Sequence, residues 1–135
     1  MPVARRKPKN APLSVSKLKK KLDIVFGHYI RWRDNHVCYT CGMVLDPKKS
    51  QCGHFVPRQY LATRYDERNN HCQCYACNVL YNGQPTAYAC HLMVEYGRDI
   101  IEELESHRKD AVKRKPDWYL EQIKIYQEKL TALEV

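Results

Sequence analysis

The chain has 135 residues, a formal net charge of +8 and seven cysteines, which is the size of one compact domain. No apolar run approaches the roughly 20 residues of a membrane-spanning helix. The N-terminal segment is basic and lacks the apolar stretch of a secretory signal. Membrane and secreted proteins are therefore disfavoured. An odd number of cysteines that includes two C-x-x-C pairs indicates a reduced compartment and a bound metal, and not a disulfide scaffold.

The positive charge is concentrated at the N-terminus. Eight of the 23 Lys and Arg residues lie within residues 1–22, which contain no acidic residue, and the other 15 balance the 15 Asp and Glu residues. Residues 1–13 also contain three prolines and are expected to form a flexible basic arm. The arm fits a nucleic-acid partner better than it fits a solubilising tail. It would contact phosphates and carry little sequence information.

A first helix is expected over residues 14–35. Ser14 or Ser16 can cap its N-terminus. Its apolar residues recur at spacings of four and three and form one stripe: Leu18, Leu22, Val25, Tyr29 and Trp32. This pattern is typical of a helix that packs on the body of the protein and presents basic side chains to solvent.

Residues 86–134 are also expected to be helical. Thr86 can cap a helix that ends near Tyr96, a second begins near Asp99, and a last one begins at Asp117. The last helix is expected to pack on the first, because its apolar repeat is too short to establish a coiled coil. The predicted fold class is α+β and mostly helical. Residues 14–135 form a single domain, in which residues 36–80 form a metal finger.

The metal finger contains two zinc knuckles. Cys38 and Cys41 form one C-x-x-C pair and Cys74 and Cys77 form the other, and two such pairs complete a tetrahedral four-cysteine site for structural Zn²⁺. The metal would supply much of the folding free energy of this polar segment. Between the knuckles we expect a β-hairpin with strands near 44–45 and 52–56 and a turn at 46–50. Three cysteines are left over as small buried or semi-buried side chains: Cys52, Cys72 and Cys90.

Polar residues surround the knuckles in a recognisable order. The first knuckle is followed by Gly53-His54-Phe55, and Asp66-Glu67-Arg68-Asn69 and His71 precede the second knuckle, which ends in Cys77-Asn78. This order resembles the HNH (His-Me finger) nucleases whose ββα metal finger is braced by a zinc ion on four cysteines. The whole pattern, with a later Tyr-Gly-x-x-x-Ile-Glu-Glu-Leu-Glu, looks more closely like the NinG/Rap recombination proteins of lambdoid phages. The resemblance covers residues 20–133 and is specific over 38–78.

The resemblance implies a zinc-braced ββα, treble-clef-like core and a metal-dependent endonuclease. In the HNH pattern His54 is the general base, Asn69 orients it, and Asn78 binds a catalytic Mg²⁺ or Mn²⁺. Imidazole suits the role of base because it accepts a proton from water near neutral pH. The position before the base, which is Asp or His in most of the class, is Gly53 here. His71 ranks first as the replacing ligand, ahead of Asp46, Asp66 or waters.

Other roles for these residues remain open. His54 could bind the ion itself, His71 could replace a cysteine at the zinc, Asn69 could be a turn residue, and Asn78 could be a helix cap. The remaining histidines are interpreted as surface or packing residues: His28, His36, His91 and His107.

The expected partner is DNA. By resemblance it is branched recombination DNA, such as Holliday junctions or D-loops, in the cytoplasm of a phage-infected bacterium. A resolvase needs two active sites, so a homodimer is possible. The predicted DNA contacts are Arg5, Arg6, Lys7, Lys9, Lys19, Lys20, Lys48, Lys49, Arg58, Arg64 and Arg68. The alternatives are a zinc module that binds nucleic acid without cutting it, and a restriction-type HNH nuclease that cuts linear duplexes.

Overall fold

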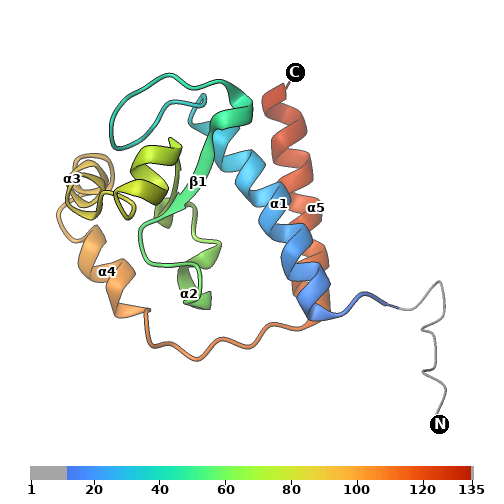
Figure 1. Cartoon of the computed structure of the whole chain (residues 1–135). Coiled ribbons are helices and arrows are strands. Elements are labelled where there is room, and N and C mark those ends of the chain that lie inside the picture. The colour runs from blue at the N-terminus through green and yellow to red at the C-terminus, as the bar shows by residue number, and fades with distance from the viewer. Residues whose placement is uncertain (1–11, 135) are drawn as a thin grey trace, which may run out of the picture.

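The computed structural model describes residues 12–134, so the predicted basic arm lies almost wholly outside the described residues. Helices α1 (Val15–Arg33) and α5 (Pro116–Glu134) lie side by side, and α3 (Pro85–Tyr96) and α4 (Ile100–Ser106) lie on the opposite side of a small sheet (Figure 1). The chain is therefore a mixed α and β protein in which helices predominate. Within residues 12–134, no helix is both long enough and apolar enough to cross a membrane.

Helix α1 begins as predicted. The Ser14 hydroxyl accepts a hydrogen bond from the Lys17 N–H at 3.3 Å, which satisfies one of the free N–H groups of the first turn. The helix ends at Arg33, two residues earlier than expected, because Asn35 and His36 have positive φ angles of 53° and 56°. The buried face is wider than the predicted stripe, since Phe26 and Ile30 are buried as well, whereas Trp32 is exposed.

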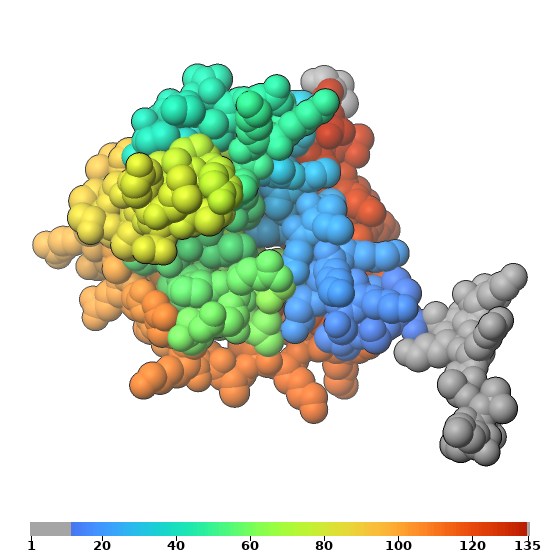
Figure 2. Space-filling model, viewed as in Figure 1, coloured from blue at the N-terminus to red at the C-terminus, as the bar shows by residue number. Residues whose placement is uncertain are grey.

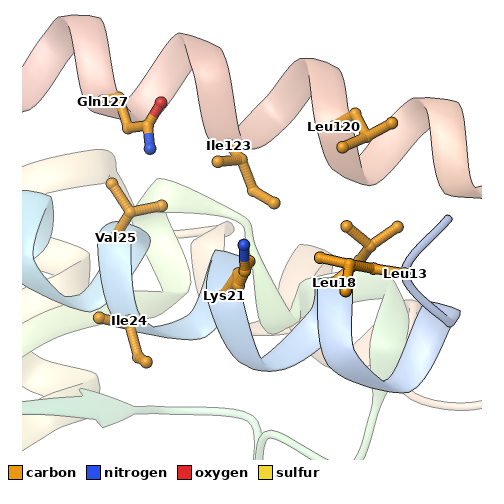
Figure 3. Close-up of a pocket in the computed structure, with 8 residues that line it drawn as sticks. All are labelled: Leu13, Leu18, Lys21, Ile24, Val25, Leu120, Ile123 and Gln127. Carbon is orange, nitrogen blue, oxygen red and sulfur yellow. The ribbon is translucent and has the colours of Figure 1, made fainter. Parts of the chain in front are cut away.

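The packing of α5 on α1 confirms the expected arrangement. The two helices run in the same direction (Figures 1 and 3). Tyr119 and Tyr126 are buried against α1, and the rings of Phe26 and Tyr126 meet edge to face with centroids 4.8 Å apart. The Tyr126 hydroxyl and the Lys129 ammonium both donate to the Glu67 carboxylate, which fixes the end of α5 to the finger.

The sheet differs from the predicted hairpin. Strand β1 (Gln51–His54) pairs antiparallel with β2 (Asn70–Gln73), and Val44 makes only an isolated bridge with Val37. The segment before β1 is a single 3-10 turn, η1 (Pro47–Lys49), which the Asp46 side chain caps. The partner of β1 was missed because β2 is polar in sequence, although all four of its residues are buried.

A second core supports the sheet from the side of α3. It is made of Val56, Tyr88, Leu92, Ile100 and Leu104. The chain between the strands contains the short helix α2 (Leu61–Arg64) and the 3-10 turn η2 (Glu67–Asn69), and η3 (Ala76–Leu80) is a short π-helical segment after β2. Helix α3 begins one residue before the predicted cap, Thr86, because Pro85 occupies its first turn. It ends at Tyr96 and is followed by Gly97, whose φ is 102°.

Candidate metal centre and histidine site

The first knuckle is a tight turn closed by backbone hydrogen bonds. The Cys38 N–H donates to the Met43 carbonyl at 2.9 Å, and the Gly42 N–H donates to the Cys38 carbonyl at 2.8 Å. Gly42 has φ 77°, a left-handed conformation that glycine adopts at little cost. This turn places both Cys38 and Cys41 beside the second knuckle.

The second knuckle leads from β2 into η3. The Asn78 N–H donates to the Cys74 carbonyl at 2.9 Å, and the Cys77 N–H points at the Cys74 sulfur at 3.4 Å. The two knuckle segments lie against each other on one face of the molecule, cyan-green and yellow-green in Figure 2. Residues more than 30 positions apart in sequence thus share one site.

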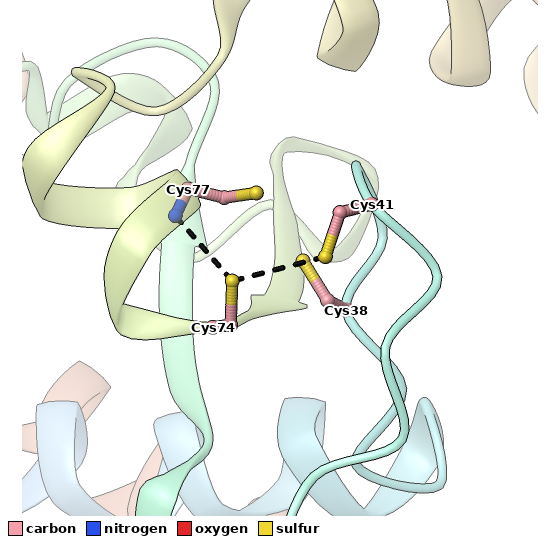
Figure 4. Close-up of side chains that lie close together, drawn as sticks. All are labelled: Cys38, Cys41, Cys74 and Cys77. Carbon is pink, nitrogen blue, oxygen red and sulfur yellow. Dashed lines mark hydrogen bonds between the residues drawn. The ribbon is translucent and has the colours of Figure 1, made fainter.

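The four sulfurs form a cluster that fits a tetrahedral metal ion. The Sγ atoms of Cys38, Cys41, Cys74 and Cys77 all lie within 4.8 Å of one another (Figure 4). The Cys41–Cys74 separation is 3.8 Å, which is about the edge of a tetrahedron whose Zn–S bonds are about 2.3 Å long. Burial alone would raise the pKa of Cys38. Hydrogen bonds from the Thr40 hydroxyl and from nearby backbone N–H groups outweigh that effect and lower this pKa to about 6. These residues fit a structural Zn²⁺, as predicted.

The strand register divides the other predicted site residues between two faces. Directly opposed residues of antiparallel strands project to the same face, and successive residues alternate. The pairs Cys52–Cys72 and His54–Asn70 therefore share one face, and Gln51–Gln73 and Gly53–His71 share the other. His54 and His71 lie on opposite faces of the sheet.

The His54 face looks toward α1 across a small cavity. The cavity has a volume of about 150 Å³ and is lined by Asp23, Phe26, Gly27, Cys52, His54 and Arg58. Within residues 12–134, Nδ1 of His54 is buried without a hydrogen-bond partner. Burial, reinforced by the charges of Arg58 and Arg64, lowers the pKa of His54 to about 4, and the Asp23 carboxylate opposes this shift. His54 is therefore neutral at physiological pH, as a proton acceptor must be.

The Asp23 carboxylate contacts most of the other polar groups around this cavity. Both of its oxygens accept from the Arg64 guanidinium, and the Tyr65 hydroxyl donates to Oδ1 at 2.7 Å. Arg58 is attached more loosely, with Nη2 3.7 Å from Oδ2. The Arg64 side chain is only 9% exposed, whereas the Arg58 side chain is 66% exposed.

His71 is a packed side chain on the opposite face. It is 1% exposed, its ring stacks on Tyr39 with centroids 3.8 Å apart, and its Nδ1 and Nε2 lie 3.2 Å from the hydroxyls of Tyr88 and Tyr96. Burial, followed by the charge of Arg33, lowers its pKa to about 3. Both ring nitrogens are engaged, so the prediction that His71 holds a catalytic ion is not supported.

Asn78 contacts the opposite end of β1 from His54. Its Nδ2 donates to Oε1 of Gln51 at 2.8 Å, and Gln51 is three residues, or about 10 Å, from His54 along the strand. The cross-strand partner of Gln51 is Gln73. The Gln73 amide fills the space beside Gly53, where an added Cβ would lie 1.8 Å from Gln73 Oε1. The residues predicted to hold Mg²⁺ or Mn²⁺ therefore do not converge, and they do not fit that ion.

Asn69 acts on the backbone and not on the His54 ring. Its side chain accepts from the Val56 N–H at 2.8 Å and donates to the carbonyls of Val56 and Thr63 at 3.0 and 3.2 Å. The expected orientation of the His54 imidazole by Asn69 is therefore wrong in its detail. Asn69 instead fixes the chain just after β1, and the asparagine beside His54 is its cross-strand partner, Asn70.

The predicted DNA contacts fall into three groups. Arg5, Arg6, Lys7 and Lys9 lie outside the described residues. Lys20, Lys48, Lys49 and Arg58 are exposed and Lys19 is partly exposed. Arg64 and Arg68 form internal ion pairs, with Asp23 and with Asp66 and Glu103 respectively. Buried Arg64 is thus wrongly assigned as a DNA contact.

Of the three leftover cysteines, Cys72 is buried and Cys52 is intermediate, as expected, but Cys90 is exposed. Sequence reasoning also missed two residues of the site, Asp23 and Gln73. Asp23 is the first acidic residue after the lysine run, and its spacing of four from Gly27 places both on one line of α1. That spacing places Asp23 on a helix line but does not indicate that it lies beside His54, and nothing in the sequence singles out Gln73.

Fold and site together define a small α and β protein with a four-cysteine cluster that could hold a metal ion. The family model described as Bacteriophage Lambda NinG protein matches residues 3–135, and the chain belongs to the NinG family. Over 111 residues it is 32% identical to protein ninG of Escherichia phage lambda and 34% identical to protein ninG of Salmonella phage P22. Each match covers 78% of this chain and 52% of the relative, so the match spans about half the length of these relatives. No solved structure matches the chain.

Proposed function

We propose that the chain is a DNA endonuclease of the HNH (His-Me finger) type that cuts branched recombination intermediates. The observation that carries the proposal is the His54 cavity, where an imidazole kept neutral by burial lies beside the exposed guanidinium of Arg58. A proton acceptor and a cation are two of the groups that hydrolysis of a phosphodiester requires.

In the proposed reaction the oxygen of water attacks phosphorus, and the bond from phosphorus to the 3′ oxygen breaks. The 3′ oxygen leaves with the bonding electron pair and takes a proton from solvent. His54 takes the proton of the attacking water, and Arg58 offsets the charge on the phosphate. Asn69 keeps the loop after β1 in place through Val56, so that His54 and Arg58 stay on the same side of the sheet. The four-cysteine centre holds the start and the end of the finger together. Dependence on Mg²⁺ or Mn²⁺ is implied by the resemblance alone.

A second function is favoured by a different observation. The residues expected to bind the catalytic ion lie on both faces of the sheet, and Gln73 occupies the space beside Gly53. This arrangement suits a zinc-containing module that binds nucleic acid without cutting it.

Cleavage assays separate the two functions. Zinc-loaded protein should cut a four-way DNA junction in Mg²⁺ or Mn²⁺, and His54→Ala should abolish cutting without changing zinc content. His91→Ala is the matched control, because His91 is exposed on α3. Binding without cleavage by the wild type in both ions would support the second function. Equal cutting of linear and branched DNA would indicate a restriction-type enzyme.

A further inference from the structure

The cavity between α1 and β1 is surrounded by an excess of positive charge. Of its lining residues, Arg58 contributes a cation, Asp23 contributes a carboxylate, His54 is neutral at physiological pH, and the others bring no charge. Arg64 does not line the cavity, but its buried guanidinium binds Asp23 and adds a second cation beside it. The unbalanced cation favours a small anionic group in the cavity.

The two arginines are held very differently. Arg64 binds Asp23 through two nitrogens and also donates to the Arg58 carbonyl at 3.3 Å, so its side chain is fixed and buried. Among residues 12–134, Arg58 makes only its 3.7 Å approach to Asp23, and two thirds of its side chain is exposed. An exposed pair of this kind contributes little free energy, so the Arg58 guanidinium is free to exchange its partner.

Helix α1 provides an approach to the cavity. Lys19, Asp23 and Gly27 follow one another at spacings of four and lie on one line of the helix, and Gly27 lies at β1, where an added Cβ would be 3.7 Å from Cys52 Cβ. Lys19 and exposed Lys20 are one turn from Asp23. A polyanion lying along this face would meet cations before it reaches His54.

We propose that this cavity is a phosphodiester subsite in which Arg58 exchanges Asp23 for a phosphate oxygen, while Asp23 is a positioning residue that keeps Arg64 in place. The inference rests on the proposed endonuclease function and adds to its site a positioning residue from α1, Asp23, which lies outside the metal finger. Asp23 has two opposed effects. The Asp23 carboxylate repels the incoming phosphate and competes with it for Arg58. The same carboxylate also fixes the Arg64 guanidinium beside the cavity.

The test measures binding separately from cleavage. The zinc-loaded 135-residue chain is titrated, without other divalent ions, with the diester thymidylyl-thymidine and with inorganic phosphate. The NMR signals of the His54 ring are followed. Arg58→Gln should weaken diester binding about two- to fivefold, the size of one exposed ion pair. Arg98→Gln removes the same charge at a fully exposed position and should have no effect.

Asp23→Asn should give changes of opposite sign. Diester binding should tighten about two- to fivefold, and junction cleavage should slow, whereas a purely structural residue would weaken both. Tyr65→Phe removes the hydroxyl that donates to Asp23 without changing charge and should leave diester binding unaltered. If Asp23→Asn does not fold, the comparison of Arg58→Gln with Arg98→Gln decides.

Several outcomes would overturn the inference. These are equal changes in diester affinity for Arg58→Gln and Arg98→Gln, weaker diester binding by Asp23→Asn, or a wild type that binds inorganic phosphate but not the diester. If His54→Ala loses cleavage but these binding changes are not found, the endonuclease proposal is supported and the subsite proposal is contradicted. If the binding changes are found but the protein does not cut DNA, the subsite proposal is supported and the endonuclease proposal is contradicted.

Discussion

Replacing Gly53 by alanine should strongly destabilise the protein. Gly53 lies in β1 and a new Cβ would be 1.8 Å from Oε1 and 2.6 Å from Cδ of Gln73. Gln73 cannot swing away freely, because it is fully buried and its Nε2 donates to Thr40 Oγ1 at 3.1 Å and to the Gly83 carbonyl at 2.9 Å. The substitution must therefore displace an anchored amide.

The expected loss can be worked from these contacts. Overpacking a buried site costs about 1–3 kcal/mol, and loss of one of the two amide hydrogen bonds adds about 1 kcal/mol. We expect a total of about 2–4 kcal/mol. For a domain of this size that corresponds to a fall in Tm of roughly 6–15 °C. Calorimetry or urea unfolding of the zinc-loaded protein measures it.

Two further variants make the reasoning refutable. Gly27→Ala is the matched control, because its Cβ would meet Cys52 only at 3.7 Å and alanine is favoured in a helix by about 1 kcal/mol. The Gly53→Ala, Gln73→Ala double variant should be no less stable than Gln73→Ala alone, since the clash is gone. Unchanged stability of Gly53→Ala, or strictly additive losses in the double variant, would refute the claim that Gln73 fills this space.

Two other predictions concern the metal centre and the histidine site. Cys41 is exposed, so Cys41→Ser removes little packing but one zinc ligand, and it should lower both the amount of bound zinc and the Tm. Cys90 is exposed and lies outside the cluster, so Cys90→Ser should change neither quantity. Equal Tm values for the two variants would contradict a four-cysteine zinc site. Because its folded pKa of about 4 lies below the unfolded value of about 6.5, His54 contributes stability that is complete above about pH 6.5 and is lost as the pH falls toward 4. The His54 ring should accordingly remain neutral at pH 5.5 in an NMR titration and Arg58→Gln should raise its pKa, whereas half-protonation of the wild-type ring near pH 6.5 would exclude the proposed burial.

The helical parts of the fold were largely predictable because their signals are local. A cap at Ser14, a glycine at position 97 and apolar residues at spacings of three and four act within one or two turns of helix. The two strands were not predictable in the same way. Strand β2 reads as a polar loop, and only its burial between α1 and α3 makes it a strand.

The sequence by itself indicated the four-cysteine cluster, because each C-x-x-C turn brings its own two sulfurs together and two such pairs supply the four ligands that a tetrahedral ion takes. Only the tertiary structure decided the surroundings of His54. The antiparallel register sends His54 toward α1 and His71 toward Tyr88 and Tyr96, and one residue along a strand changes the face. Asp23 reaches this site from another part of the chain through the packing of α1, which no local pattern specifies.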